Sequence, residues 1–402
     1  MKILPHKNLF IGINDILCRI FFENKYTDNE IEKTLKANPR WGSKDRSFIA
    51  ETVYDCVRWK RMIEASSGRP LNENNLWEFV GSWFVLNGEK LPHWEEFQKI
   101  NPKEVLKRNH AATDKNFAVR ESIPDWMDEM GMDELGEKIW QREIEKMNNT
   151  LPTVIRVNSL KIDRKSLLKK LKETGVDAVA LSKYPDALEL VEKTNVLKTE
   201  AFKEGGFEIQ DAGSQMIAPF LDVRPGMRVV DACAGAGGKT LHLSALMQNK
   251  GQIFALDIHE WKLRELKRRA KRNNAQNIQT RLIDSSKVIK RLENSADRLL
   301  LDAPCSGLGV LSRNPGAKWK LTSEFIEKIK DEQRKILNDY SKMVKTGGAM
   351  VYATCSILPS ENHLQIKYFL KNHPEFKLVR EKQLLPSQTG YDGFYMAFLE
   401  KL

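Results

Sequence analysis

The chain has 402 residues, 41% of them apolar, which is enough for two or three domains with hydrophobic cores. Lysine and arginine total 65 against 54 aspartate and glutamate residues, and the net charge of +11 favours a polyanionic partner. Five cysteines without a C-x-x-C pair argue against a disulfide framework and predict reduced thiols in a cytoplasmic protein. The start lacks a secretory signal, and no apolar run is long enough to cross a membrane. We expect neither a membrane partner nor a bound metal, and the sequence makes no prediction of oligomeric state.

Residues 1–145 are predicted to form a helical domain. Apolar residues recur at helical spacing between residues 44 and 60, and Ser43 is placed to cap that helix. The polar stretch 101–115 is interpreted as a linker. A further helical stretch is predicted from residue 124 to about residue 147.

The next segment, residues 146–205, is predicted to be a small α/β subdomain. A strand at 153–157 precedes a helix that Asp163 can cap and Gly175 can end. The basic side chains of this segment include Arg156, Lys161, Arg164, Lys165, Lys169 and Lys170. They form either an ordinary solvated face or a surface that faces RNA, and both interpretations stay open. The stretch 207–214 is expected to lead into a catalytic sheet.

A glycine-rich stretch, DACAGAGGKT at residues 231–240, lies between a β-prone run and an apolar helix. Glycine is favoured at such a turn because the backbone passes close to a bound ligand at a helix N-terminus. A phosphate-binding P-loop is excluded because Cys233 stands where its first glycine is required, and Thr240 breaks the dinucleotide-binding pattern. The remaining pattern is an aspartate, three residues and then G-x-G. It resembles the first motif of S-adenosylmethionine-dependent methyltransferases.

Aspartates follow several of the predicted strands. Asp257, Asp284 and Asp302 each come directly after an apolar run. Open α/β sheets bind ligands at the carboxyl ends of their strands, and Asp257 is placed to accept hydrogen bonds from both hydroxyls of a ribose. A single aspartate at a strand end is usually a turn residue. Together with Asp231, these residues make four aspartates at strand ends around a glycine-rich turn, and this arrangement favours a nucleoside-binding site.

The helix predicted after Asp257 is strongly basic. Between residues 262 and 272 it carries seven lysine and arginine residues, with only Glu265 to offset them. Such a charged face usually points into solvent, but a large excess of positive charge favours contact with phosphates.

Two cysteines come after predicted strands on the ligand side of the sheet. Cys305 lies in DAPCSG after the run 299–301, and Cys355 lies in ATCS after the run 349–352. A thiolate that adds to carbon-6 of cytosine makes carbon-5 nucleophilic enough to take a methyl group from a sulfonium. Cysteine is also a common buried residue, but two at strand ends beside a cofactor loop favour catalysis. The cysteines interpreted as structural are Cys18, Cys56 and Cys233.

Four stretches together resemble the RsmB-like family of RNA cytosine-5 methyltransferases: DACAGAGGKT, DAPCSGLG, ATCSILPSEN and the closing GYDGFYMAFL. The resemblance covers nearly the whole chain. The stretch WGSKDRSFIAETVYDCVRW, which begins at Trp41, is similar to the family's helical NusB-like RNA-binding domain. TVIRVNSLK and FEIQDAGSQ are similar to its small RNA-recognition subdomain.

This resemblance implies an α/β fold in three parts. A Rossmann-like class I methyltransferase domain at 206–402 follows a small α/β subdomain at 146–205 and an all-α NusB-like domain at 1–145. The implied cofactor is S-adenosylmethionine, and the residues that would bind it or line its site are Cys233, Ala234, Gly235, Ala236, Gly237, Gly238, Lys239, Asp257, Asp284 and Asp302. Cys355 matches the family nucleophile, and Cys305 matches the cysteine that helps to release the product. Asp302 would also hydrogen-bond the flipped base.

The chain departs from the family pattern in two places. The family loop usually reads C-A-A-P-G-G-K, so Gly235 and Ala236 predict a less rigid cofactor loop in this chain. Gly316 and Ala317 stand where an acidic and then an apolar residue is common, in the loop expected on the substrate side.

The sequence thus predicts an enzyme that methylates carbon-5 of a cytosine in RNA through a covalent cysteine adduct. Small-subunit rRNA is the preferred substrate and tRNA the alternative, and the target base should be unpaired or flipped into the site. One rival is a DNA cytosine methyltransferase with Cys305 of the pair Pro304–Cys305 as nucleophile, and Cys355 argues against it. The other is a non-catalytic RNA-binding assembly factor, which would need neither thiol.

Overall fold

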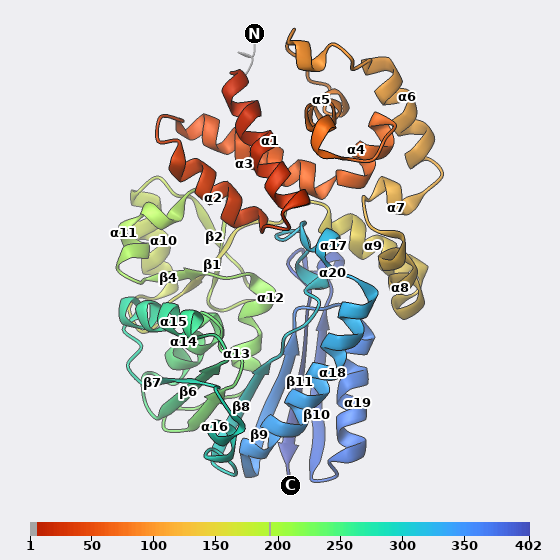
Figure 1. Ribbon diagram of the computed structural model, residues 1–402. Coiled ribbons are helices and arrows are strands. Elements are labelled where there is room, and N and C mark those ends of the chain that lie inside the picture. The colour runs from red at the N-terminus through yellow and green to blue at the C-terminus, as the bar shows by residue number, and fades with distance from the viewer. Residues whose placement is uncertain (1–5, 193) are drawn as a thin grey trace. The chain divides into compact units, whose positions relative to one another are not determined.

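The computed structural model describes residues 6–192 and 194–402, so the first five residues of the predicted helical domain lie outside the described residues. The chain divides into two units. The first comprises Met1–Asn148 and Arg313–Thr322, and the second comprises Asn149–Ser312 and Ser323–Leu402. Figure 1 labels most of their helices and strands.

The first unit is helical, as predicted. Its described helices are α1 (Lys7–Phe22), α2 (Thr27–Ala37), α3 (Ser43–Arg58), α4 (Lys60–Ser67), α5 (Leu76–Leu86), α6 (Pro102–Thr113), α7 (Phe117–Arg120), α8 (Asp125–Leu135), α9 (Glu137–Met147) and α17 (Ala317–Lys320). Its core is built from the apolar faces of α1, α3 and α5. There the Phe10 ring lies among five other aromatic rings, with 4.9 to 6.3 Å between centroids.

Two local predictions in this unit are wrong. Ser43 is the first residue of α3 and not its cap; the residue before it, Gly42, donates its backbone N–H to the Asp45 carboxylate at 3.1 Å. The stretch 101–115 is not a linker, because α6 occupies most of it. The Asn101 side chain accepts hydrogen bonds from two backbone N–H groups of the first turn, and proline occupies the first helical position. These start signals outweigh the polar composition of the stretch.

The segment Arg313–Thr322 belongs to the helical unit although it comes late in the chain. Lys318 holds this segment in the helical unit: its side chain is only 1% exposed, and its Nζ lies 2.6 Å from Asn148 Oδ1. Three backbone carbonyls, those of Arg58, Glu121 and Ser122, lie 3.2 to 3.3 Å from the same atom.

The turn before Lys318 explains one departure from the family pattern. A Cβ at Gly316 would lie 3.1 Å from Thr27 Oγ1 and 3.6 Å from Val57 Cγ1. The larger acidic side chain that is common at this position would therefore be crowded where the turn meets α2 and α3.

We expect Lys318 to make the stability of the protein depend on pH. Burial, together with the Arg58 charge, lowers the pKa of Lys318 from 10.5 to about 7, although Glu121 opposes the shift. Between these two pH values the unfolded chain binds one more proton than the folded chain, so stability should rise with pH in that window and be lowest below pH 7. Urea unfolding of the wild type and of Lys318→Met, from pH 6.5 to 9.5, measures this.

The wild type should gain stability relative to the variant by up to roughly 1 kcal/mol per pH unit. The comparison between the two proteins cancels the other titrating groups. Unfolding free energies that change in parallel across the range would contradict the prediction.

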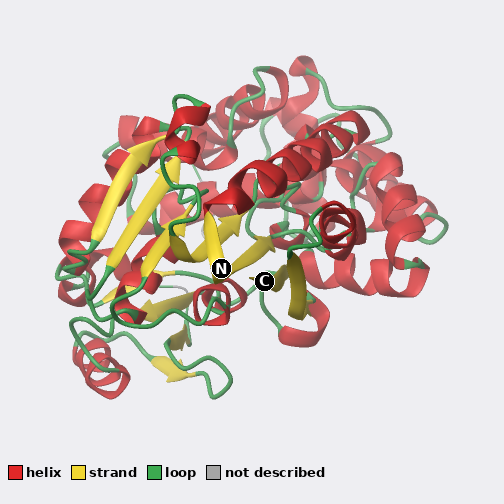
Figure 2. Ribbon diagram, turned by 90° about the horizontal axis from the view of Figure 1, so that it is seen from below, coloured by secondary structure: helices red, strands yellow, loops and turns green. Residues whose placement is uncertain are grey.

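The second unit contains two sheets, whose strands are yellow in Figure 2. Its described strands are β1 (Val154–Val157), β2 (Ala178–Ala180), β3 (Ala187–Leu190), β4 (Phe207–Ile209), β5 (Arg228–Asp231), β6 (Gln252–Asp257), β7 (Ile278–Leu282), β8 (Ala296–Asp302), β9 (Val344–Thr354), β10 (Phe376–Leu384) and β11 (Phe394–Lys401). Its described helices are α10 (Arg164–Glu173), α11 (Glu200–Lys203), α12 (Ala212–Gln215), α13 (Ile217–Phe220), α14 (Gly238–Leu246), α15 (Glu260–Asn273), α16 (Ser286–Lys290), α18 (Ser323–Tyr340), α19 (His363–Asn372) and α20 (Pro386–Thr389). None of the helices in residues 6–192 and 194–402 is long and apolar enough to cross a membrane.

The smaller sheet has four antiparallel strands in the order β2-β3-β1-β4. Asp163 caps α10 as predicted, because its carboxylate accepts hydrogen bonds from two backbone N–H groups at 2.9 and 3.1 Å. Gly175 follows the helix with a φ of 77°, which confirms the predicted end. The prediction that residues 207–214 lead into the catalytic sheet is wrong for their first part. β4 pairs with β1, and Phe207 is buried in the core of the smaller sheet.

The larger sheet has seven strands in the order β10-β11-β9-β8-β5-β6-β7. Strands β9, β8, β5, β6 and β7 are parallel, whereas β11 and β10 form an edge in which each strand pairs antiparallel with its neighbour. The strand order reverses between β5 and β8, and open α/β sheets bind ligands at such a switch point. The predicted Rossmann-like fold is confirmed.

Helices cover both faces of this sheet and hold its strand ends in place. On one face Val230 and Leu299 pack with residues of α16, α18 and α19. On the other face Val229 and Leu300 pack with residues of α13 and α14. Adjacent residues of β5 and β8 thus face opposite helical layers, as the two-residue period of a strand requires.

Candidate active site

The glycine-rich loop joins β5 to α14. Gly235 and Gly237 have φ angles of +54° and +90°, a left-handed conformation that other residues rarely adopt. A Cβ at Gly237 would lie 2.6 Å from Leu266 Cγ, so this glycine lets α15 approach the loop. At Gly235 and Gly238, no atom of the described residues beyond the chain neighbours lies within 4 Å of the Cβ position. The backbone there borders open space that a ligand can occupy.

Asp257, the last residue of β6, holds this loop in place. Its carboxylate accepts hydrogen bonds from the backbone N–H groups of Gly235 and His259, each at 2.8 Å, and the residue is 6% exposed. The sequence indicated a ribose contact but not this backbone role, because the role depends on the loop lying beside the end of β6.

Asp231, the last residue of β5, is buried beneath the same loop. Its Oδ2 accepts a hydrogen bond from Thr240 Oγ1 at 2.7 Å, whereas its Oδ1 has no hydrogen-bond partner among the described residues. Burial raises the pKa of Asp231 to about 7, against the hydrogen bond from Thr240. A buried carboxylate oxygen without a partner suits a ligand that donates hydrogen bonds through ammonium or hydroxyl groups.

Lys239 of α14 and Asp302 at the end of β8 form an ion pair, with 2.6 Å between Nζ and Oδ2. Their side chains are 14% and 27% exposed. Burial alone would lower the pKa of Lys239, but the charge and hydrogen bond of Asp302, with the nearby Cys355, raise it above the ordinary value. The site therefore keeps a fixed positive charge beside a thiol.

The two cysteines predicted to act together lie together. Cys305 Sγ and Cys355 Sγ are 3.3 Å apart, at the carboxyl ends of the neighbouring strands β8 and β9, and both thiols are free. The hydrogen bond with Cys355, followed by burial, raises the pKa of Cys305 well above its ordinary value. The two sulfur atoms lie within hydrogen-bonding distance, and either thiol can be the donor.

Backbone contacts bring the closing stretch of the chain to the two thiol loops. The Gly309 N–H donates to Cys355 O at 2.9 Å, and the Gly393 N–H donates to Gly309 O at 2.7 Å. A Cβ at Gly309 would lie 2.4 Å from Gly393 O, so glycine is required where these loops cross. Three of the stretches that carry the family resemblance therefore meet at one place.

Two other predicted site residues are less closely joined to this cluster. Asp284 lies exposed beyond the end of β7 and accepts a hydrogen bond from Ser285 Oγ at 3.0 Å. Burial raises the pKa of Cys233 well above its ordinary value, which agrees with its interpretation as a structural cysteine. In the part of the chain that the structure describes, no group of three or more histidine, cysteine, aspartate or glutamate side chains is arranged to hold a metal ion.

Two arginines hold carbonyl groups of the glycine-rich loop and the start of α14, which the sequence did not reveal. Arg156 is 2% exposed and donates to Gly238 O at 2.6 Å, so it belongs neither to a solvated face nor to an RNA-facing surface. Arg269 of α15 donates to Ala236 O at 2.8 Å. Both contacts join residues that are far apart in the chain, so no local pattern predicts them.

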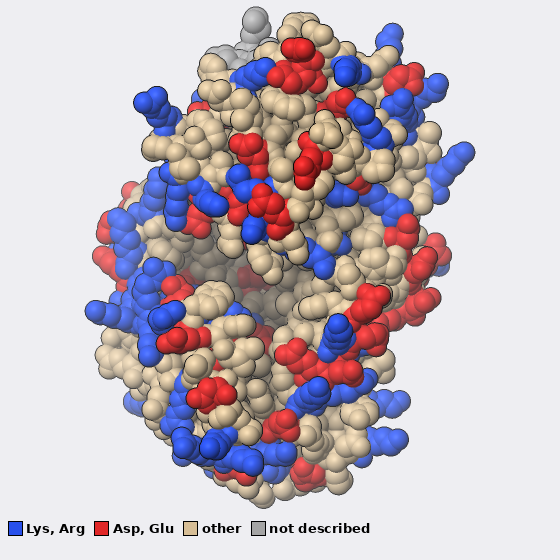
Figure 3. Space-filling view, viewed as in Figure 1, with Lys and Arg blue, Asp and Glu red and all other residues tan. Residues whose placement is uncertain are grey.

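The prediction that the lysine and arginine side chains of α15 contact phosphates is wrong for two of the seven. Arg269 and Arg272 both form ion pairs with Glu208 of β4, which is 3% exposed. The basic side chains of α15 that stay exposed are Arg264, Lys267, Arg268 and Lys271. Figure 3 shows lysine and arginine side chains gathered on the left of the view, over α15.

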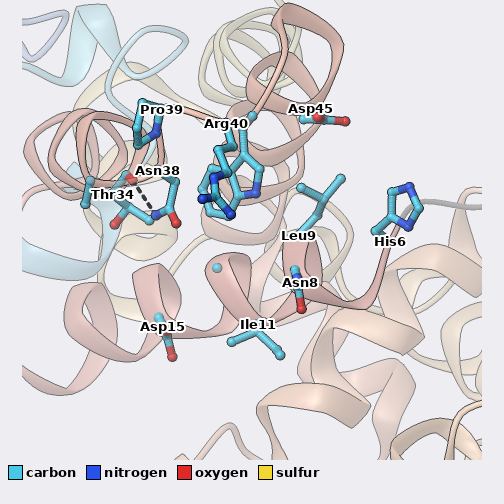
Figure 4. Close-up of a pocket in the computed structure, with 13 residues that line it drawn as sticks. His6, Asn8, Leu9, Ile11, Asp15, Thr34, Asn38, Pro39, Arg40 and Asp45 are labelled. Atoms are coloured by element: carbon cyan, nitrogen blue, oxygen red, sulfur yellow. Dashed lines mark hydrogen bonds between the residues drawn. The ribbon is translucent and has the colours of Figure 1, made fainter.

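A separate hollow of about 720 Å³ lies in the first unit, between the start of α1 and the loop after α2 (Figure 4). Its lining includes the exposed Arg40, the half-buried Trp41 and the amides Asn8 and Asn38. Arg46 fixes the loop by donating to Trp41 O at 2.9 Å and to Asn38 O at 3.2 Å.

A Rossmann-like sheet with a glycine-rich loop at its switch point and aspartates at its strand ends defines the class of S-adenosylmethionine-dependent methyltransferases. Residues 218–400 match the family described as 16S rRNA methyltransferase RsmB/F, and residues 123–197 match the RsmF/B-like ferredoxin-like domain. The chain belongs to the RsmB/F family of rRNA methyltransferases, whose cofactor is S-adenosylmethionine. The open backbone at Gly235 and Gly238 and the unpartnered oxygen of Asp231 fit this cofactor.

Individual relatives agree with this assignment. The probable ribosomal RNA small subunit methyltransferase B of Synechocystis sp. is 30% identical over 442 residues, covering 98% of each chain. The Bacillus subtilis protein of the same description is 34% identical over 297 residues, covering 69% of this chain and 65% of that protein. The crystal structure of PH0851 matches all of both chains, with a TM-score of 0.84 and 27% identity. NSun6 from Pyrococcus horikoshii, solved with SFG, shares the fold at 22% identity and a TM-score of 0.65, covering 70% of this chain and 99% of that one.

Proposed function

We propose that this protein methylates carbon-5 of a cytosine in small-subunit ribosomal RNA through a covalent bond between Cys355 and carbon-6. The observation that carries the proposal is the 3.3 Å separation of the Cys305 and Cys355 sulfur atoms, beside the Lys239–Asp302 ion pair. The relatives described as ribosomal RNA small subunit methyltransferase B support the choice of substrate.

In this reaction the Cys355 thiolate forms a bond to carbon-6, which makes an electron pair available at carbon-5. Carbon-5 takes the methyl group, which S-adenosylmethionine supplies as a methyl sulfonium. The carbon-5 proton then leaves to a base, the carbon-5–carbon-6 double bond forms again, and the bond between Cys355 and carbon-6 breaks. Cys305, 3.3 Å from Cys355, assists this release.

Asp302 serves as the contact for the base. Its side chain keeps 27% of its surface exposed at the carboxyl end of β8, and one of its oxygens is bound to Lys239. The carboxylate can accept a hydrogen bond from the exocyclic amino group of a cytosine that has been flipped out of its helix.

We also infer that the front domain, predicted at 1–145 and NusB-like, binds RNA together with the subdomain predicted at 146–205. Trp41 and Arg40 both line the hollow in the first unit, and unpaired bases stack on indole rings and guanidinium planes. The predicted cytoplasmic location accords with a ribosomal RNA substrate and five free cysteines.

Bisulfite sequencing of total RNA from cells with and without the gene tests the proposed function. Methylation at carbon-5 protects cytosine from conversion, so one cytosine of the small-subunit rRNA should convert only when the gene is absent. The wild-type gene should restore protection, and a gene encoding Cys355→Ala should not. Identical conversion of every rRNA cytosine in both strains would exclude this substrate, and a change confined to tRNA would favour the alternative.

Asp257→Ala should weaken the binding of S-adenosylmethionine by roughly 1.5–3 kcal/mol, about 10- to 100-fold in affinity. The variant loses both the proposed ribose contact and the hydrogen bonds that hold Gly235. Asp297→Ala is a matched control, because Asp297 accepts the Arg228 N–H at 2.6 Å at the opposite end of the same sheet. Calorimetry should show normal affinity for the control, and equal affinities for both folded variants would remove Asp257 from the cofactor site.

Removing exposed basic side chains of α15 should lower the affinity for RNA and make that affinity less dependent on salt. The variant replaces Lys267, Arg268 and Lys271 by alanine. A control of equal charge replaces Lys342, Lys345 and Lys377, which lie beside or within β9 and β10, whereas α15 joins β6 to β7. The slope of log affinity against log salt concentration should decrease by about one for each phosphate that the variant no longer neutralises. If both triple variants keep the wild-type slope, α15 faces solvent only.

A further inference from the structure

The residue after each site cysteine is a serine, and both serines bind one buried carboxylate. Ser306 Oγ and Ser356 Oγ each donate to Glu361 Oε1 at 2.5 Å. The Ser306 backbone N–H donates to Glu361 Oε2 at 2.8 Å. Glu361 is completely buried, in a short 3-10 turn between β9 and α19.

Further hydrogen bonds connect Glu361 to residues that precede the cysteines. Gln333 Nε2 of α18 donates to Glu361 Oε2 and to Pro304 O, both at 3.0 Å. The Tyr352 hydroxyl donates to Glu361 O at 2.8 Å. The backbone on both sides of the thiols is therefore tied to one residue, directly or through Gln333 and Tyr352.

The hydrogen bonds at Glu361 suit a group that only accepts. Its two oxygens receive hydrogen atoms from four donors: the Ser306 N–H, the Ser306 hydroxyl, the Ser356 hydroxyl and the Gln333 amide. An ionised carboxylate can accept all of them, whereas the amide nitrogen of a glutamine would make both serine hydroxyls turn and accept. Glutamine would thus reverse these two hydrogen bonds and remove the charge without changing the side-chain volume.

The charge of Glu361 also acts on the Cys305 thiol. It adds to the hydrogen bond and the burial that raise the pKa of Cys305. The positive charge of Lys239 lies instead close to Cys355, which in turn raises the pKa of that lysine. Opposite charges therefore flank the pair of thiols.

We propose that Glu361 is a positioning residue that sets the distance between the Cys305 and Cys355 thiols. It acts through the serines that follow the cysteines. The catalytic consequence rests on the proposed function, but the arrangement of the thiols can be measured without RNA.

The distance is tested by the rate at which diamide converts the two thiols to a disulfide, taking up two electrons and two protons. A short Sγ–Sγ distance makes this reaction fast, so Glu361→Gln should slow it at least about tenfold. The pH at which Cys305 becomes alkylated should shift downward, because the negative charge is gone. With RNA, kcat should fall by roughly 10²-fold at unchanged KM. Glu143→Gln removes an equally buried carboxylate in the first unit and should change none of these values.

Ser306→Ala and Ser356→Ala each remove one hydroxyl bound to Glu361, and each should also slow disulfide formation. They keep the test decisive if Glu361→Gln does not fold. Wild-type disulfide rates and alkylation profiles in the folded variants would overturn the positioning role. A wild-type protein that forms the disulfide quickly but methylates no RNA would refute the proposed function and leave the role of Glu361 intact.

Discussion

Cys355→Ala should neither methylate RNA nor bind it covalently, whereas Cys305→Ala should methylate once and accumulate as an RNA–protein adduct. Removing the nucleophile should lower methylation by on the order of 10⁴-fold or more. The sulfur atoms are 3.3 Å apart in one site, and the different outcomes follow from the roles proposed for the two thiols. Under the proposed mechanism, Cys305→Ala leaves the attacking thiol in place and removes the group that assists its departure.

A denaturing gel of each variant with substrate RNA and S-adenosylmethionine distinguishes these outcomes. Only Cys305→Ala should give a persistent band of protein-bound RNA. Cys18→Ala, which changes a thiol of the first unit, should behave as the wild type. An adduct with Cys355→Ala and none with Cys305→Ala would reverse the assignment and favour the Pro304–Cys305 arrangement of DNA methyltransferases. Full methylation by both variants would exclude thiol catalysis.

The order of strands and helices in the second unit could be predicted because each element is marked by a local sequence pattern. Each parallel strand is an apolar run, and the residues that matter come at its carboxyl end, as with Asp257 and Asp302. Once the strands are parallel and adjacent, the pairing of β8 with β9 brings Cys305 and Cys355 together without further information. The sequence therefore predicted the proximity of the thiols, although not their hydrogen bond.

The supporting contacts could not be predicted because they join distant parts of the chain. Ser306 and Glu361 are 55 positions apart, Arg156 and Gly238 are 82 apart, and Lys318 reaches a carbonyl 260 positions earlier. The local sequence does not distinguish these residues from surface residues, because a charged side chain can be recognised as buried only when its partners are known. The missed helix α6 is different, because Asn101 and the proline after it are start signals that polar composition obscured.

Lys239→Met should lower kcat by roughly 10²–10³-fold, the loss expected when one fixed charge is removed from a preorganised site. The ammonium group lies 2.6 Å from Asp302, and the nearby Cys355 contributes to the raised pKa of this lysine. Without the ammonium group, a partly buried carboxylate loses its partner, and a thiolate at Cys355 loses the positive charge that stabilises it. Both changes would oppose the proposed attack on carbon-6.

Alkylation of Cys355 by iodoacetamide at fixed pH, quantified by peptide mass spectrometry, separates activation of the thiol from binding of the base. If Lys239 activates the thiolate, Lys239→Met should slow alkylation even without RNA, while Lys250→Met, an exposed lysine before β6, should not. Slow methylation with normal alkylation would assign Lys239 to the base or the cofactor instead. Normal rates of both reactions would reduce Lys239 to a structural partner of Asp302, and the charge beside the thiols would then have no part in catalysis.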